Sequence, residues 1–385
     1  MAPANGTALV IGGGIGGLAA AIGLHRTGWE VTVLERFAAP DDAGAGISLA
    51  ANGIRALDAL GVGGAVRAAA RPQYTGGTRT PDGRPLSRMD GAALERALGT
   101  PVTGIPRAEL HRLLRGALPP GCLRTGVTGS LDTALRGEGP APAPDLVVAA
   151  DGVRSASRAR LFPDHPGPVY SGSTVLRAIT AEPVDLDADF ELTWGPGAEF
   201  GHIAFADGRA EWHAVLAAPP GVRHAHPLAV LRQRFAHWQE PVARLLAATR
   251  PEDVLHHDVH ELATPLPSYA AGRVALLGDA AHAMTPNLGQ GACQALEDAV
   301  TLAAELAAGP DVPTALARYD AVRRPRSQAV ARAARRAGRL GHRLSHPVAV
   351  SLRNGALRLA PSGAVVRGIL RHADWTPPRL PARAV

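Results

Sequence analysis

The spacing of apolar and polar residues divides the chain into segments with different predicted structures. Near the N-terminus, "TALVI" and "WEVTVLE" are short apolar runs typical of buried strands, and the alanine-rich stretch between them predicts a helix. From about residue 169 to 261, runs such as "STVLRAI", "DFELTWG" and "AEWHAVLAAP" are separated by Gly, Pro and Asp, which predicts an antiparallel sheet. Beyond it, "RVALLGD" predicts another buried strand, followed by a helix with Leu296, Val300 and Ala303 on one face.

A glycine-rich turn joins the first predicted strand to its helix. In "VIGGGIGGLAA", Gly12, Gly14 and Gly17 have the G-x-G-x-x-G spacing, whose glycines serve a tight turn, the close approach of a pyrophosphate and the packing of helix on strand. Glu35 ends the second strand, where its carboxylate can accept hydrogen bonds from a ribose diol. The segment therefore predicts a dinucleotide, either FAD or NAD, because Glu35 would repel the 2′-phosphate of NADP.

Two further segments place carboxylates at the ends of predicted strands. In "GDAAHAMTPNLGQGACQALEDA", Asp279 follows a buried strand, and Gly289 and Gly291 open the next helix, whose first N–H groups have no partner within the helix. In "LVVAADGVRS", Asp151 also ends a strand, which is where ligands sit in open α/β sheets. Arg107 begins another predicted helix and opposes its dipole, so we expect either a carboxylate or phosphate partner or a plain surface position.

The composition excludes several kinds of chemistry and partner. All 40 basic residues are arginine, so no lysine can form a Schiff base or serve a P-loop. The two cysteines show neither metal-ligand spacing nor a disulfide framework, which predicts a reducing, cytoplasmic compartment. The histidines of "HHDVH" lack a second ligand cluster, so no metal is expected. No run is suited to span a bilayer, and the late arginine run "RRPRSQAVARAARRAGRLGHR" predicts a solvated helical face, so we expect neither a membrane nor a nucleic-acid partner.

The glycine-rich turn, the Asp-Gly turn and the Gly-Asp segment, in this order, resemble the FAD-dependent aromatic hydroxylases. These are single-component flavoprotein monooxygenases such as 4-hydroxybenzoate, salicylate and urate hydroxylases, and the resemblance runs from the N-terminus to about Pro378. It implies an α/β fold in which a Rossmann-like FAD-binding domain is interrupted by an antiparallel β-sheet substrate domain, with C-terminal helices. The implied FAD-binding domain comprises residues 1–72, 100–165 and 262–385, and the substrate domain comprises residues 73–99 and 166–261.

The resemblance also assigns residues to the cofactor. Asp279 is expected to bind a ribityl hydroxyl, and the segment from Pro286 to Gly291 is expected to border the isoalloxazine. Arg154 is the candidate for contact with the transient co-substrate NADH or NADPH. The full set of residues implied to bind FAD is Gly12, Gly14, Ile15, Gly17, Glu35, Arg36, Arg107, Asp151, Asp279, Pro286, Gly289, Gln290 and Gly291.

The implied reaction uses NAD(P)H and dioxygen to hydroxylate a small aromatic or heteroaromatic substrate through a flavin C(4a)-hydroperoxide. No catalytic base can be named; the candidates for the pocket wall are Phe205, Trp212 and His213, of which the last two alternate along a strand and must face opposite sides. One alternative is an epoxidase or other oxygenase of a polycyclic natural product. Another is an inactive flavin-binding accessory protein, because the segment between Leu114 and Asp151 is shorter than usual in the family. The expected assembly is a monomer or homodimer.

Overall fold

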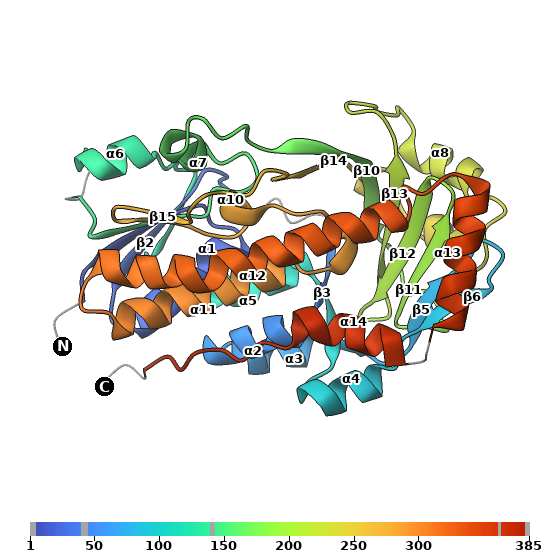
Figure 1. Ribbon diagram of the computed structural model, residues 1–385, viewed down its shortest axis with the longest axis horizontal. Coiled ribbons are helices and arrows are strands. Elements are labelled where there is room, and N and C mark those ends of the chain that lie inside the picture. Colours follow the sequence, from blue (N-terminus) through green and yellow to red (C-terminus); the bar gives the residue numbers. More distant parts are fainter. Residues whose placement is uncertain (1–4, 40–44, 139–142, 361–362, 382–385) are drawn as a thin grey trace.

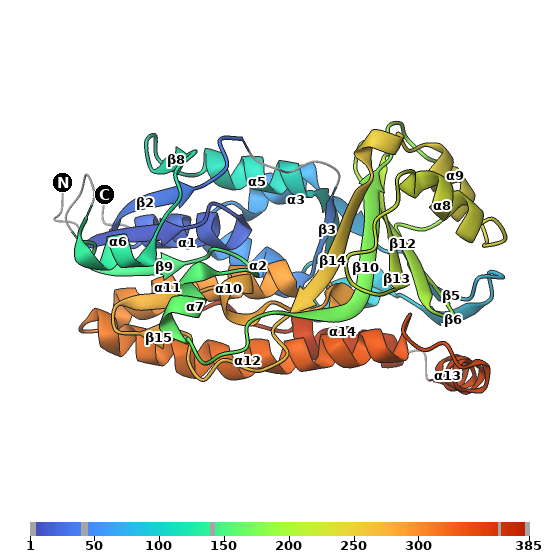
Figure 2. The ribbon, with the colours of Figure 1, turned by 90° about the horizontal axis from the view of Figure 1, so that it is seen from above.

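The computed structural model describes residues 5–39, 45–138, 143–360 and 363–381. Two sheets lie at opposite ends of an elongated molecule, and a long helix, α12 (Val312–Leu340), runs along both (Figures 1 and 2). Its N-terminal half packs on the first sheet's helices, and its C-terminal end reaches the second sheet. The chain crosses between the two ends several times, so residues that are distant in sequence meet at the junction.

The first sheet is built from strands of four separate chain segments. Its order is β15-β16-β9-β1-β2-β8, and all neighbours are parallel except the edge pair β15 and β16. Parallel strands have their carboxyl ends at one edge, so the turns that follow β1, β9 and β16 lie together there. The strands are β1 (Thr7–Ile11), β2 (Glu30–Glu35), β8 (Leu123–Thr125), β9 (Leu146–Ala149), β15 (Ala270–Ala271) and β16 (Val274–Leu276).

The second sheet has seven strands in the order β14-β10-β13-β12-β11-β5-β6. Its neighbours are antiparallel, as the sequence predicts, except β5 and β11, which are parallel because β5 comes from a distant segment rather than a hairpin. The strands are β5 (Gly76–Arg79), β6 (Pro85–Arg88), β10 (Val169–Ile179), β11 (Phe190–Gly195), β12 (Ala198–Ala204), β13 (Ala210–Ala217) and β14 (Leu255–Glu261). Helices α8 (Pro227–Arg234) and α9 (Val242–Ala247) cover its outer face.

A small sheet of three strands joins the two ends. It consists of β3 (Gly46–Leu49), β4 (Arg71–Gln73) and β7 (Val102–Pro106), with β7 in the centre. A Cβ on Gly46 would lie 2.5 Å from the Cβ of Glu211 and 2.9 Å from the ring of Phe205, so β3 packs directly on the second sheet. Glycine is required at this position because the two backbones approach so closely.

Helices fill the space around the sheets. Helices α1 (Ile15–Arg26) and α11 (Gly291–Ala308) pack on each other beside the first sheet. The others are α2 (Ala51–Ala59), α3 (Gly63–Ala69), α4 (Gly91–Leu98), α5 (Arg107–Gly116), α6 (Leu131–Arg136), α7 (Ala156–Leu161), α10 (Asp279–His282), α13 (Pro347–Leu359) and α14 (Gly363–Ala373), with short 3-10 turns η1 (Pro251–Asp253) and η2 (Pro286–Leu288). No helix in the described ranges could cross a membrane.

The late arginine run forms most of α12, and its predicted role as a solvated face is partly wrong. Arg323 is completely buried and is paired with Glu297 and Asp298 of α11. Arg335 is held 2.8 Å from Glu261 of β14. These arginines serve internal ion pairs, because one face of α12 packs on α11 and β14 while its other face is exposed.

Candidate cofactor and active site

The glycine-rich turn after β1 is shaped to receive a phosphate. Gly12 has a φ of +108°, and a Cβ on it would collide with the carbonyl oxygen of Ala150. A Cβ on Gly17 would collide with the backbone of Gly12, so the helix packs directly on the turn. At Gly14, the residue that caps α1, no side chain caps the helix and no atom lies within 4 Å of the Cβ position. The first N–H groups of α1, including that of Ile15, are therefore open to an anionic group.

Glu35 is fixed beside this turn by the backbone. Its Oε2 accepts the Gly13 N–H at 2.7 Å and its Oε1 accepts the Phe37 N–H at 2.9 Å. A carboxylate oxygen can accept more than one hydrogen bond, so these contacts orient Glu35 and leave it able to receive hydroxyl groups. The exposed Arg36 guanidinium lies 4.7 Å from the ring centre of Phe37. His111 of α5 adds a contact that no sequence signal indicates: its Nε2 lies 2.8 Å from the Gly13 carbonyl oxygen.

The Asp-Gly turn after β9 uses its carboxylate to begin α7. Asp151 accepts from the Ser155 hydroxyl at 2.6 Å and from the Ser157 N–H at 3.0 Å, which leaves Arg154 exposed beside the turn. The residue that links this turn to the Gly-Asp segment is Arg158, which sequence reasoning missed although it stands in "DGVRSASR".

Arg158 is buried and donates to the carbonyl oxygens of Val153 (2.8 Å) and Ala280 (3.1 Å). Burial lowers the pKa of this arginine, while the carboxylates of Asp151 and Asp279 act to raise it. The guanidinium therefore fastens the two motifs to each other at the carboxyl edge of the first sheet.

Asp279 begins α10 and is exposed. The described residues provide no hydrogen-bond donor to its carboxylate, so it is available to a ligand. The turn that presents it is held from behind: Gly278, with a φ of +61°, donates its N–H to buried Asp298 at 3.0 Å, and His282 Nε2 lies 2.6 Å from the same carboxylate oxygen.

The segment from Pro286 to Gly291 offers backbone donors rather than side chains. Gly289 has a φ of +61°, and no atom lies within 4 Å of the Cβ positions of Gly289 or Gly291. No side chain caps α11. The side chain of Gln290 is buried, and its Oε1 accepts from Asn52 at 2.9 Å, so only the backbone of Gln290 can serve the cofactor.

Two adjacent carboxylates in α11 form a buried ion-pair cluster behind this segment. Arg323 donates to Asp298 at 2.7 Å and also to Glu297. Arg326 donates to both oxygens of Glu297, at 2.7 and 2.8 Å. Burial alone would raise the pKa of Asp298, but His282 and Arg323 hold it below its usual value. We define Glu297, Asp298, Arg323 and Arg326 as the α11–α12 cluster.

Taken together, these residues fit FAD. Two helix starts, α1 and α11, lack side-chain caps and have open space before their glycines. In the sequence, Asp279 lies between these two helix starts, and it follows a strand at the same edge of the first sheet. Its carboxylate is free to accept a hydrogen bond from a hydroxyl group. An elongated cofactor with a pyrophosphate, a sugar chain and an anionic ring system matches this order of donors and acceptors.

The second sheet turns a row of polar residues toward the cofactor domain. His213 of β13 stands between Arg177 of β10 and Gly201 of β12 in the strand register, and a Cβ on Gly201 would collide with the His213 ring. His213 Nδ1 lies 3.1 Å from Glu211 Oε2, and Glu211 is buried. Burial alone would lower the pKa of His213, but Glu211 and Glu199 raise it overall.

Arg177 places a positive charge on this face, with an Nε donor that is unpaired among the described residues. Its Nε is buried without a hydrogen-bond partner in the described part of the chain. Burial lowers its pKa, Glu211 acts in the opposite direction, and repulsion from Arg107 lowers it further. Arg107 is exposed at the start of α5, and its backbone N–H bonds to Ala45 just before β3. The electrostatic contact between the two arginines shows that the second sheet and the cofactor domain meet here.

The other two candidates for the pocket wall lie elsewhere. Trp212 is completely buried on the outer face, stacks on Phe200 at 5.6 Å and donates to Thr249 at 2.7 Å under α8 and α9. It is therefore removed from the pocket, because strand alternation gives the inner face to His213. Phe205 is also buried, with its ring against Gly46 of β3, so it supports the junction and does not face an open site.

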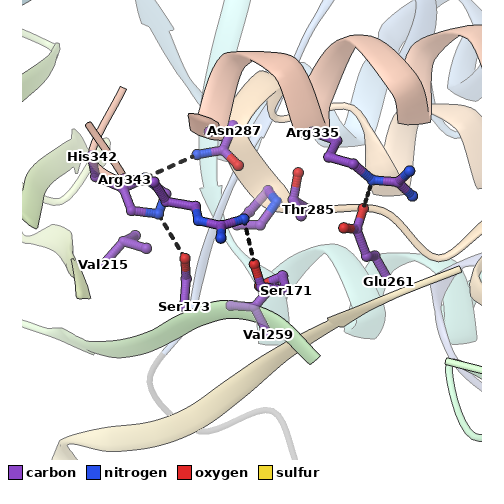
Figure 3. Close-up of a pocket in the computed structure, with 12 residues that line it drawn as sticks. Ser171, Ser173, Val215, Val259, Glu261, Thr285, Asn287, Arg335, His342 and Arg343 are labelled. Atoms are coloured by element: carbon purple, nitrogen blue, oxygen red, sulfur yellow. Dashed lines mark hydrogen bonds and ion pairs between the residues drawn. The ribbon is translucent and has the colours of Figure 1, made fainter. Parts of the chain in front are cut away.

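A small cavity of about 10 Å³ lies where the second sheet, η2 and α12 meet (Figure 3). His342 bridges it: its Nε2 lies 2.8 Å from the Ser173 hydroxyl, and its Nδ1 lies 3.4 Å from the Asn287 amide. The hydroxyl groups of Ser171 and Thr285 are buried there without partners in the described structure. The volume suits about one water molecule and not an aromatic ring, so this is a joint between sheet and cofactor segment.

Comparison with known proteins identifies the family. The family model described as "FAD binding domain" matches residues 6–119 and 124–334. The chain is 37% identical over 381 residues to the aurachin C monooxygenase/isomerase of Stigmatella aurantiaca, covering 96% of this chain and 98% of the relative. It is 38% identical over 352 residues to a 3-amino-4-hydroxybenzoate 2-monooxygenase of Streptomyces platensis, covering 86% and 88%. The crystal structure of Klebsiella pneumoniae HpxO complexed with FAD and uric acid matches with a TM-score of 0.86 at 27% identity, covering 95% and 96%.

These matches confirm the predicted fold class, the FAD cofactor with an NAD(P)H co-substrate, and an enzyme instead of an inactive accessory protein, since the relatives are named monooxygenases. They extend over nearly the whole chain, so both the cofactor domain and the second sheet are included. The chain belongs to the family of FAD-dependent aromatic hydroxylases.

Proposed function

We propose that this monooxygenase hydroxylates an electron-rich aromatic ring that carries an acidic hydroxyl or carboxylate group. The observation that carries the proposal is the row formed by Arg177, His213 and Gly201 on the inner face of the second sheet. Arg177 supplies positive charge without a bonded partner at Nε, and Gly201 leaves room for the His213 ring, which lies against it. A ring with an anionic substituent would satisfy that charge.

His213 is suited to hold the substrate hydroxyl. The contact with Glu211 favours a proton on Nδ1 and leaves Nε2 as the acceptor for a proton from a phenolic hydroxyl. Transfer of that proton to Nε2 makes the ring more electron-rich, and Glu211 stabilises the imidazolium that results. When bound, FAD supplies the redox chemistry, since it takes electrons from NAD(P)H and activates dioxygen. The chain positions the substrate and excludes water.

We infer that the residues at the carboxyl edge of the first sheet hold FAD in the way the resemblance implies. The uncapped start of α1 would take the pyrophosphate, Glu35 the adenosine ribose, Asp279 the ribityl chain and the start of α11 the pyrimidine end of the flavin. Arg154, exposed beside the Asp-Gly turn, is proposed to contact the phosphates of NAD(P)H.

The division into cofactor and substrate domains is proposed at the boundaries given above, supported by the membership of β5 and β6 in the second sheet. Both cysteines are free and buried, which supports a cytoplasmic location.

The test is NAD(P)H oxidation by the purified protein with a panel that includes 3-amino-4-hydroxybenzoate, urate and aurachin C, the compounds in the names of its relatives and of the related structure. An aromatic acid or phenol should stimulate oxidation and gain one labelled atom from labelled dioxygen. His213→Gln should weaken turnover most at pH values where His213 is neutral and the substrate hydroxyl is still protonated, while leaving flavin content unchanged. Stimulation by uncharged rings alone, or a His213→Gln variant with an unaltered pH profile, would reject the proposed role of this face.

A further inference from the structure

A C-terminal segment of the chain is rich in arginine and has no acidic residue of its own. Residues 321–373 contain 12 arginines and no aspartate or glutamate. Some of these arginines serve internal contacts, as Arg323 and Arg335 do. The exposed ones are Arg332, Arg336, Arg339, Arg343, Arg358, Arg367 and Arg371. Neither the cofactor site nor the face around His213 uses them, so their positive field is available to another anionic partner.

Helix α13 adds an apolar stripe within this basic segment. Val348, Leu352, Ala356 and Leu359 follow one another at helical spacing, and all are exposed. The exposed fractions are 61% for Val348, 71% for Leu352 and 87% for Leu359. Single exposed apolar residues are common on proteins, but a continuous stripe along one helix face indicates a partner.

The orientation of α13 is fixed by its opposite face. The guanidinium of Arg353 donates to the carbonyl oxygens of Leu340 (3.0 Å) and Gly341 (2.8 Å) at the end of α12, and it lies 5.2 Å from the ring centre of Trp194. Figure 1 shows α13 alongside the strands at the far edge of the second sheet, and Figure 2 shows it nearly end-on at the outside of the molecule. The inner face of α13 therefore packs on the end of α12 and on Trp194, and no described element covers the apolar stripe on its outer face.

We propose that α13 lies on the surface of an anionic lipid bilayer. Its apolar stripe would enter the boundary of the acyl chains, and neighbouring arginines such as Arg339 and Arg358 would bind headgroup phosphates, for which the planar guanidinium is well suited. A second copy of the chain is a poorer partner, because a symmetric contact would bring together two copies of this basic segment, which has no aspartate or glutamate. The expectation of no membrane rested on the lack of a spanning run, and a helix that lies on the surface needs none.

The test is flotation of the FAD-loaded, full-length protein with two kinds of vesicle, pure phosphatidylcholine and phosphatidylcholine mixed with phosphatidylglycerol. Binding is expected only to the anionic vesicles and should weaken as salt is raised, because the Debye length shortens. The double variant Leu352→Ser with Leu359→Ser should lower the vesicle partition coefficient at least about tenfold. Arg339→Gln with Arg358→Gln should lower it by roughly tenfold.

Matched controls lie outside the α13 surface. Val322→Ser removes an apolar side chain of α12 that is 50% exposed, and Arg234→Gln with Arg250→Gln removes two exposed arginines near α8 and α9. These variants should float as the wild type does, and all variants should keep their flavin. Absence of flotation with anionic vesicles would overturn the proposal, as would equal flotation of the Leu352→Ser, Leu359→Ser variant. A wild-type dimer that does not float and becomes monomeric in that variant would assign the stripe to self-association instead.

Discussion

Replacing Arg323 by methionine tests whether the α11–α12 cluster supports both the fold and the flavin segment. The Arg323 side chain is fully buried and donates to Asp298, Glu297 and both the backbone and side-chain oxygens of Gln294. Methionine fills a similar length without a charge. The variant therefore removes the guanidinium and leaves two carboxylates in a buried site.

The expected loss of unfolding free energy depends on the partners that Glu297 and Asp298 keep in the variant. Glu297 keeps Arg326, which donates to both of its oxygens, whereas Asp298 keeps only His282 and the Gly278 N–H. Removing one partner of a buried ion pair costs about 3–5 kcal/mol, and the surviving partners place this case near the lower end, at about 3 kcal/mol of unfolding free energy. Because Asp298 also holds the turn that presents Asp279, FAD affinity should fall by roughly tenfold, the scale of one charge-assisted hydrogen bond.

The assay is urea unfolding of the flavin-free protein together with FAD titration. Arg324→Met is the matched control: Arg324 is the next residue of α12 and is also paired with an aspartate, Asp320, at 3.0 Å, but its side chain is 34% exposed. Its loss should cost at most about 1 kcal/mol. If the two variants lose the same stability, or if Arg323→Met binds FAD as the wild type does, the argument that buried charge supports the flavin segment is refuted.

The cluster also predicts a direction for pH dependence. The pKa of Asp298 is held below the ordinary carboxyl value of about 4, so its interactions stabilise the folded state above that pH and are lost as the pH falls through the lower, folded-state pKa. Arg323→Met removes one of the three groups that lower this pKa, and His282 and the Gly278 N–H remain. The acid limb of its stability curve should therefore begin at a higher pH than that of the wild type, measured as the urea midpoint against pH.

Three further predictions address separate residues. Asp279→Ala should weaken FAD binding by about 1.5–3 kcal/mol, because a ribityl hydroxyl loses a charged acceptor; flavin fluorescence measures this, and unchanged affinity would contradict the assignment. Arg154→Gln should raise the apparent KM for NAD(P)H without changing flavin affinity; loss of flavin with normal reductant kinetics would reverse that role. Burial lowers the pKa of His202 to about 4. Between about pH 6.5 and 4 the unfolded chain therefore binds a proton at His202 that the folded protein does not, so the free energy of unfolding should fall as the pH drops through this range. His202→Gln should flatten that limb in urea unfolding, and an unchanged slope would show that another group causes it.

The cofactor-binding half of the protein could be predicted from the sequence, because positions where the backbone requires glycine are visible in the sequence itself. Gly12 and Gly17 must be glycine to avoid collisions with neighbouring backbone, and Gly289 adopts a positive φ. Such positions can be recognised in a single sequence, since glycine is the residue that meets them without strain. The fold class, the FAD cofactor and the monooxygenase activity were implied by the family resemblance that these motifs carry, and the family match confirms them.

Residues that act through long-range contacts could not be recognised in the same way. Arg158 joins the Asp-Gly turn to Ala280, and Arg323 reaches back to α11 across 26 residues. In the sequence these arginines look like their exposed neighbours, because arginine is favourable on a solvated helix face and its burial depends on which carboxylate the fold brings near. Only the packing of α12 on α11 separates buried Arg323 from exposed Arg332.

The second sheet shows a different limit. Alternation along β13 correctly places Trp212 and His213 on opposite faces, but it cannot say which face meets the cofactor domain. A tryptophan near a flavin site is an attractive pocket residue, yet α8 and α9 need an apolar surface to pack on and take the Trp212 side. The face left for the junction is therefore the polar one, where Glu211 orients His213 and the Nε of Arg177 lacks a hydrogen-bond partner among the described residues. Buried polar groups are costly unless they are hydrogen-bonded, which is the physical reason for proposing that the substrate binds at this face.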